Sequence, residues 1–183
     1  MATKAKTKAS RAAERKSGRS QGSNRGSARA SSPTALELLE QDHREVAEWF
    51  DVYDELQEDD DKAELAEKIC LALKVHTKIE EEIFYPQARK ATKDNDLLDE
   101  AIVEHASAKR LIEEIESMEV GEDLYDAKMR VLGEQIKQHI REEEEELFPE
   151  IESAKMDVAA VGKQMAARKD ELMSELHGEA GER

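Results

Sequence analysis

Cysteines, aromatic residues and long hydrophobic runs are all scarce in this sequence. It has one cysteine, Cys70, among 183 residues, and Phe, Tyr and Trp together make up 4%. A single cysteine excludes an internal disulfide and a zinc site built from cysteines, so we expect Cys70 to be a small buried residue. No segment approaches the roughly 18 apolar residues that a membrane span needs. The sequence therefore predicts neither a membrane span nor a signal peptide.

The net charge of -16 is divided unevenly along the chain. Residues 1–33 hold nine Lys or Arg and one Glu, a net charge of +8, so residues 34–183 carry -24. The first segment also lacks large apolar residues, which predicts a disordered basic tail. Such a tail is typical of weak nucleic-acid contact, of organellar targeting or of a solvated extension. We expect a cytoplasmic protein, with targeting by the tail as the alternative.

From Thr34 onward, apolar residues recur in alternating steps of three and four, which predicts helices. Thr34 and Glu37 have the spacing of a capping box at the first helix start. Pro86 and Pro149 are expected to disturb the second and fourth helices at their ends. The four predicted helices cover about residues 34–58, 61–86, 96–118 and 123–149.

Short connections between long helices make neighbouring helices antiparallel. The sequence therefore predicts an all-α fold, an antiparallel up-down-up-down four-helix bundle over residues 34–150. Residues 151–183 are predicted to form a short C-terminal amphipathic helix, which Asp157 caps, and a tail. The apolar face of this fifth helix is expected to comprise Val158, Val161, Met165 and Leu172.

Each predicted bundle helix carries one histidine in its apolar stripe. These residues are His43, His76, His105 and His139. One such histidine is usually a hydrogen-bonded core residue, but four on four helices favour a shared site. Glu80 and Glu143 each follow a histidine by four residues, which places carboxylate and imidazole on one helix face. A buried carboxylate is costly unless it is paired or binds a metal.

The pattern is an internal repeat. His76, Glu80 and Pro86 recur 63 residues later as His139, Glu143 and Pro149, and His43 and His105 are 62 residues apart. Four imidazoles and two carboxylates are too many for one tetrahedral zinc and fit two transition metals bridged by carboxylates, with iron favoured. A ferritin-like site needs Glu-x-x-His on two helices. The chain has this motif once, from Glu40 to His43, which disfavours that architecture.

Four segments occur in a characteristic order, residues 41–46, 76–86, 104–109 and 139–149. On these segments the chain resembles the hemerythrin-like family of HHE cation-binding domains over about residues 35–150. The resemblance implies a four-helix bundle holding a non-haem di-iron centre with an oxo or hydroxo bridge. It also implies that the metal ligands are the terminal histidines His43, His76, His105 and His139 and the bridging carboxylates Glu80 and Glu143.

One position departs from the family pattern. Oxygen-carrying hemerythrins have a second histidine one turn after the third-helix histidine, where this chain has Lys109. We expect Lys109 to form an ion pair with a core glutamate, with extension of its charge to the surface as the alternative. One iron would then be more open, or would take a further ligand from Glu104, Glu142, Glu144 or Tyr53. The family's sensors and peroxide-handling members share this reduced ligand set.

The resemblance therefore implies a protein that interacts with O2, peroxide or NO in sensing, iron handling or oxidative-stress protection, with catalase-like activity as one form of it. Two alternatives stay open. The first is a metal-free helical interaction module. The second is a nucleic-acid-associated protein that binds through residues 1–33, although the acidic body would repel phosphate.

Overall fold

The computed structural model describes residues 32–92 and 95–180, with side chains to residue 175. The secondary structure of this part of the chain is entirely helical, as predicted. The elements are α1 (Ala35–Glu55), α2 (Asp59–Ile79), the π-helix η1 (Glu80–Phe84), α3 (Tyr85–Ala91), α4 (Asp96–Glu116), α5 (Tyr125–Glu142), the π-helix η2 (Glu143–Leu147), α6 (Phe148–Ser153) and α7 (Val158–Ala180). The predicted basic tail lies outside the described residues except for its last two positions.

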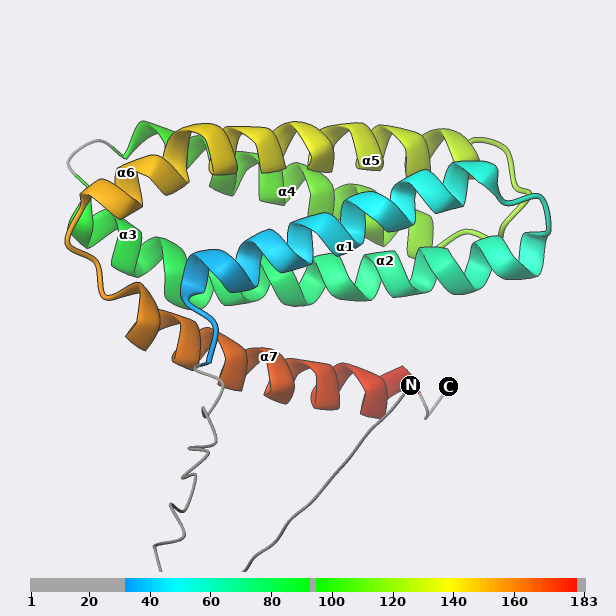
Figure 1. Cartoon of the computed structure of the whole chain (residues 1–183). Helices are drawn as coiled ribbons and strands as arrows, with labels where there is room; N and C mark the ends of the chain where they lie inside the picture. Colours follow the sequence, from blue (N-terminus) through cyan, green and yellow to red (C-terminus); the bar gives the residue numbers. More distant parts are fainter. Residues whose placement is uncertain (1–31, 93–94, 181–183) are drawn as a thin grey trace, which may run out of the picture. The chain divides into compact units, whose positions relative to one another are not determined.

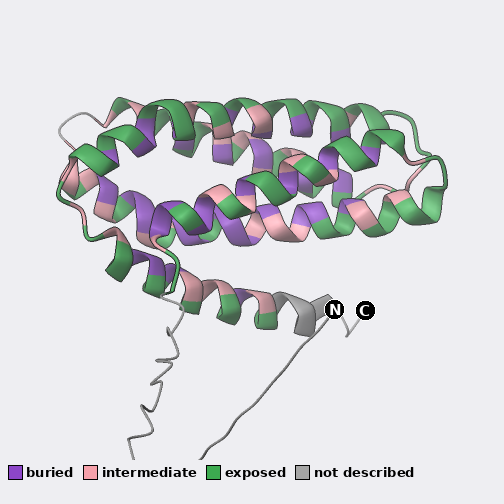
Figure 2. Ribbon diagram, viewed as in Figure 1, coloured by how far each residue is buried: buried purple, intermediate pink, exposed green. Residues whose placement is uncertain are grey.

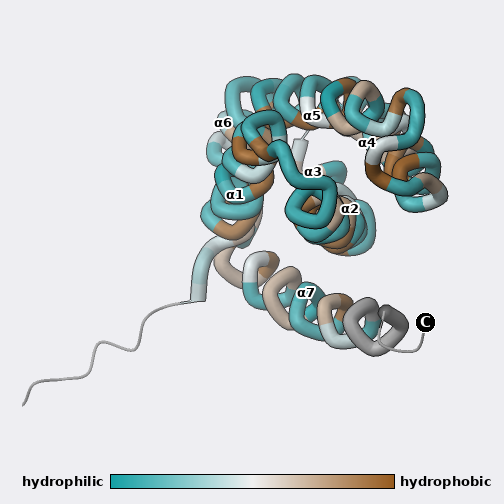
Figure 3. The backbone as a smooth tube through the Cα atoms, turned by 90° about the vertical axis from the view of Figure 1, so that its right-hand side faces the viewer, coloured by the Kyte–Doolittle hydropathy of each residue, from teal (hydrophilic) through white to brown (hydrophobic). Residues whose placement is uncertain are grey.

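Four long helices form an antiparallel bundle. Helix α1 contacts α2 and α5, and α4 contacts α5 and α2, so the four helices occupy the corners of a square (Figures 1 and 3). This arrangement confirms the predicted four-helix bundle. Helix α7 packs on the outside against α1 and α2, as the expected fifth helix. Within the described ranges, no helix combines the length and apolar character needed to cross a membrane.

Local side-chain interactions explain where helices α1 and α2 begin. The Glu37 backbone N–H donates to the Thr34 hydroxyl at 3.3 Å, and the Thr34 N–H donates to the Glu37 carboxylate at 2.8 Å, which completes the predicted capping box. Helix α2 begins at Asp59, two residues before the expected start. Its first turn holds three aspartates, residues 59–61, whose charges favour the positive end of the helix dipole.

The bundle core consists of two apolar clusters with a polar layer between them. On α1, residues 35–39 belong to one cluster and residues 46–53 to the other, with His43 between them. The buried positions lie on the inner faces of all four helices (Figure 2). On α4, Ala101 and His105 face the core, whereas Ile102 is 42% exposed.

The chain stays helical beyond both prolines, contrary to the expected disturbance. At each place the α-helix first widens into five π-helical residues, and the Tyr85 N–H donates to the Glu80 carbonyl, five residues back. Phe148 and Glu143 make the same bond at the end of η2. Pro86 then falls in the first turn of the next helix, where a missing N–H is tolerated. Helix α6 consequently runs across the predicted boundary at residue 150.

Candidate metal centre

The structure brings all six predicted ligand residues together in the polar layer, and each is at most 7% exposed. Helices α1 and α4 contribute one histidine each. Helices α2 and α5 contribute one histidine each and lead into η1 and η2, whose first residues are Glu80 and Glu143. The wider π turn begins at the carboxylate in both repeats, and such turns are frequent at functional sites. Periodicity alone did not predict these two π turns.

The four imidazoles form two pairs. The Nε2 atoms of His43 and His76 lie 3.2 Å apart, and those of His105 and His139 also lie 3.2 Å apart. An imidazole that donates from Nδ1 presents a lone pair at Nε2. Two lone pairs this close repel each other unless a proton or a metal cation lies between them.

Each carboxylate lies between the two histidine pairs. Glu80 Oε2 is 3.2 Å from His76 Nε2 and 3.3 Å from His105 Nε2. Glu143 Oε2 is 3.4 Å from His43 Nε2 and 3.6 Å from His139 Nε2. Two groups of donor atoms thus lie close enough to hold a metal ion, and Glu80 belongs to both. The groups are His43, His76, Glu80 and Glu143, and Glu80, His105 and His139.

Hydrogen bonds leave these carboxylates incompletely satisfied. Within the described part of the chain, both oxygens of Glu80 and Oε2 of Glu143 are buried without a hydrogen-bond partner, although imidazole nitrogens lie within 3.6 Å. A buried carboxylate is costly unless positive charge compensates it. Because imidazole and carboxylate are both good ligands for transition metals, the donor set fits a bound metal cation.

Each imidazole also faces a carboxylate at Nδ1. The Nδ1-to-oxygen distances are 2.8 Å for His43 and Glu144, 3.5 Å for His76 and Asp42, 3.1 Å for His105 and Glu81, and 2.8 Å for His139 and Glu104. The contact between His76 and Asp42 is too long for a hydrogen bond, and we describe it as an ion pair. Carboxylates in this position fix the ring orientation and direct Nε2 towards a metal.

Sequence analysis missed these supporting roles. Asp42 and Glu104 directly precede a centre histidine, and Glu81 and Glu144 directly follow a centre glutamate, so the supports obey the same repeat. Glu104 and Glu144, two of the predicted additional ligands, therefore accept hydrogen bonds from imidazole Nδ1 atoms. Tyr53 lies elsewhere, because its hydroxyl donates to Asp126 at 2.9 Å in the other apolar cluster.

Lys109 forms an ion pair, but its partner is the 32% exposed Glu81 and not a glutamate of the core as expected. Its Nζ lies 2.6 Å from both carboxylate oxygens of Glu81, and its side chain is 40% exposed. Glu81 in turn accepts from His105 Nδ1. Lys109 therefore acts on the centre through Glu81 and adds no donor to it. Cys70 is buried as expected, and burial raises the pKa of its thiol to about 12.

Tyr85 breaks the symmetry of the two repeats. Its ring stacks on His105 at 5.5 Å between centroids, just as Phe148 stacks on His43 at 5.9 Å. The Tyr85 hydroxyl donates to Glu143 Oε1 at 2.7 Å and lies 3.3 Å from His105 Nε2. Burial and the charges of Glu80 and Glu143 hold its pKa well above 10, so the hydroxyl remains a donor.

A fold of four antiparallel helices with histidines and glutamates converging between them defines a cation-binding helical bundle. Residues 34–151 match the Hemerythrin HHE cation binding domain, and the chain belongs to that family. It also resembles the crystal structure of an HHE cation binding domain-containing protein, the Rv2633c homolog from Mycobacterium kansasii, with a TM-score of 0.68 and 22% identity over 78% of this chain and 89% of that one. That likeness supports the fold.

A curated relative, the DNA nickase of Nostoc sp. (strain PCC 7120 / SAG 25.82 / UTEX 2576), is 27% identical over 149 residues. The match covers 79% of this chain and 41% of the nickase. The chain thus spans about two fifths of the length of this relative.

The metal-free centre should lose stability as the pH rises. Burial lowers the pKa of His76, but Glu80 and Asp42 outweigh it and raise the value from 6.5 to about 10. Because the folded pKa lies above the unfolded one, the stabilisation is complete below pH 6.5 and disappears as the pH approaches 10. We expect the melting temperature of chelator-treated protein to fall across this window, and a His76→Gln variant to lose this component. Unchanged stability over the window would contradict the prediction.

Proposed function

We propose that this protein is a non-haem di-iron protein that binds or reacts with O2, peroxide or NO, in sensing, iron handling or oxidative-stress protection. The observation that carries the proposal is the arrangement of the donor atoms. Two histidine pairs lie next to each other, and a buried glutamate, Glu80 or Glu143, contacts one histidine of each pair. A cytoplasmic location and peroxide decomposition are parts of the same proposal.

Two metal ions account for this donor arrangement better than one. Each histidine pair presents its own two Nε2 atoms, and each glutamate approaches one histidine of each pair. A structural zinc site is satisfied by four ligands in a tetrahedron. Six imidazole and carboxylate ligands distributed over two ions suit iron and leave coordination positions for a small ligand.

Each histidine pair would hold one metal ion. His43 and His76 would bind the first ion, and His105 and His139 the second. Glu80 offers two unpartnered oxygens, whereas Glu143 offers only Oε2, because Oε1 already accepts from a tyrosine hydroxyl. Bound iron supplies redox chemistry and an affinity for small oxidants.

The Tyr85 hydroxyl is placed to donate a hydrogen bond at the second pair. It lies between Glu143 Oε1 and His105 Nε2 and stays protonated at physiological pH because its pKa is raised. Phe148 supplies no such donor at the first pair. We therefore infer that the two metal positions would be chemically inequivalent, with a hydroxyl hydrogen-bond donor at the side of His105.

The Lys109 ion pair favours reaction or sensing over reversible oxygen carriage. Lys109 occupies the position where oxygen carriers place an additional histidine, and its Nζ is held by Glu81. One metal position would consequently have one imidazole fewer and more room for an exogenous ligand.

Iron content tests the proposal. Protein reconstituted with ferrous iron should hold about two ions per chain, as in other two-metal sites. A Glu143→Gln variant should hold less than about one, because it removes the charge that lies between both histidine pairs. The matched control is Glu146→Gln, an exposed carboxylate three residues further along η2, which should leave the content unchanged. Equal iron content in both variants would contradict the assignment of Glu143 to the site, and no iron in the wild type would favour the metal-free interaction module.

A second proposal concerns residues 1–33, whose net charge is +8. We propose weak contact with nucleic acid through this segment, since the curated relative is named as a DNA nickase. Binding of duplex DNA by the full chain should weaken steeply with added salt, and a chain beginning at Thr34 should not bind. Equal binding by the two chains would contradict this proposal.

A further inference from the structure

The internal repeat gives the centre two equivalent flanks, one between α1 and α2 and one between α4 and α5. The repeat offset pairs each position on one flank with a position on the other. The pairs are Leu38 with Glu100, Asp42 with Glu104, His76 with His139, Ile79 with Glu142, and Glu80 with Glu143. Two apolar residues on the first flank are thus glutamates on the second.

The flank of α1 and α2 is sealed. Leu38 and Ile79 are 6% and 0% exposed, and they belong to the same apolar cluster as Met165 and Leu172 of α7. Lys169 of α7 also forms an ion pair with Asp42, the carboxylate that faces His76. Helix α7 therefore closes this side of the centre with apolar packing and one buried contact.

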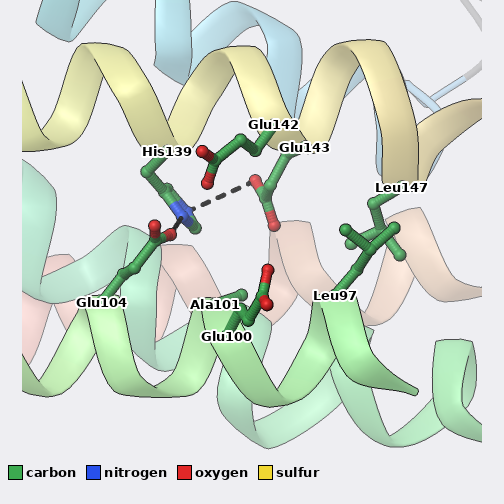
Figure 4. A pocket seen from close by; sticks show the side chains of 8 residues that line it. All are labelled: Leu97, Glu100, Ala101, Glu104, His139, Glu142, Glu143 and Leu147. Atoms are coloured by element: carbon green, nitrogen blue, oxygen red, sulfur yellow. Dashed lines mark hydrogen bonds and ion pairs between the residues drawn. The ribbon is translucent and has the colours of Figure 1, made fainter.

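The flank of α4 and α5 is open. A pocket lies between α4 and the junction of α5 with η2, and its walls include Glu100, Glu104 and Glu142 (Figure 4). At its inner end lie two residues of the centre, His139 and Glu143. Figure 4 shows Glu143 directed towards Glu100 across the pocket.

Four of the eight residues that line this pocket are glutamates, beside His139 and the apolar Leu97, Ala101 and Leu147. Glu100 is exposed and makes no hydrogen bond or ion pair within the described ranges. Glu104 accepts from His139, and Glu142 accepts from the neutral Gln138. A concave surface lined by charges of one sign raises the local concentration of the opposite ion.

A buried carboxylate at the inner end of the pocket indicates the kind of ligand that the pocket binds. Glu143 is 2% exposed and lines the pocket, and its Oε2 has no hydrogen-bond partner. The acidic mouth thus leads to a buried carboxylate oxygen that makes no hydrogen bond in the described part of the chain and faces the Nε2 atoms of His43 and His139 at 3.4 and 3.6 Å. Neutral oxidants gain little from three carboxylates, whereas a divalent cation is attracted and ligated by them.

We propose that this pocket is the route by which a divalent transition-metal cation reaches the centre. Glu100, Glu104 and Glu142 are its first carboxylate ligands, and His139 and Glu143 receive the ion from them. The inference rests on the proposed metal centre and adds the direction of loading, since the equivalent flank is covered by α7.

The test compares the rate of ferrous iron uptake with the final iron content. Metal-free full-length protein is mixed anaerobically with ferrous iron, and the iron left in solution is captured by a colorimetric chelator at successive times. A Glu100→Gln, Glu142→Gln double variant should take up iron roughly tenfold more slowly, the scale of electrostatic steering, and reach the wild-type content.

The matched control is the Glu113→Gln, Glu134→Gln double variant. Both residues are exposed carboxylates on α4 and α5, outside the pocket, so the change in net charge is identical. Its uptake rate should stay within about twofold of wild type, because screened surface charges act weakly at a distance. Equal slowing in the two double variants, or none in either, would overturn the route while leaving the metal centre intact. Failure of the wild type to bind iron would overturn the centre and the route together.

Discussion

Four imidazoles and two carboxylates cannot share the middle of a helical bundle unless positive charge lies between them. The Nε2 atoms within each pair are 3.2 Å apart, and both oxygens of Glu80 are buried without a hydrogen bond. Protons meet this demand in the metal-free chain, which is why the pKa of His76 is raised and that of Glu80 is lowered. A metal cation meets it by replacing protons, so metal binding and protonation compete for the same atoms.

The rest of the fold keeps this polar layer in place. Apolar clusters close it on both sides along the bundle axis, and the π turns of η1 and η2 begin at its two carboxylates. Outer carboxylates orient the rings, and Lys109 and Lys169 compensate two of them, Glu81 and Asp42. The two repeats differ in two respects. Tyr85 occupies the position equivalent to Phe148, and α7 packs on the flank of α1 and α2.

Much of this architecture could be predicted from the sequence, because its periodicity and its repeat offset are both regular. These signals located the bundle helices, the fifth helix and the six residues that converge, whose role as ligands stays a prediction. They could not reveal the π turns, since five residues in each segment are too few to establish a different apolar period. The outer carboxylates resembled solvated surface, as glutamate runs usually do. Tyr53 was a wrong candidate, since the helical rise of about 1.5 Å per residue puts it about 15 Å along α1 from His43, where its hydroxyl donates to Asp126.

The central claim is that the two histidine pairs each hold an iron ion. Anomalous diffraction at the iron absorption edge, from crystals of the iron-loaded protein, locates such ions directly. The account predicts two peaks in the polar layer, one beside the Nε2 atoms of His43 and His76 and one beside those of His105 and His139. A single peak, or peaks confined to the surface carboxylates, would contradict it.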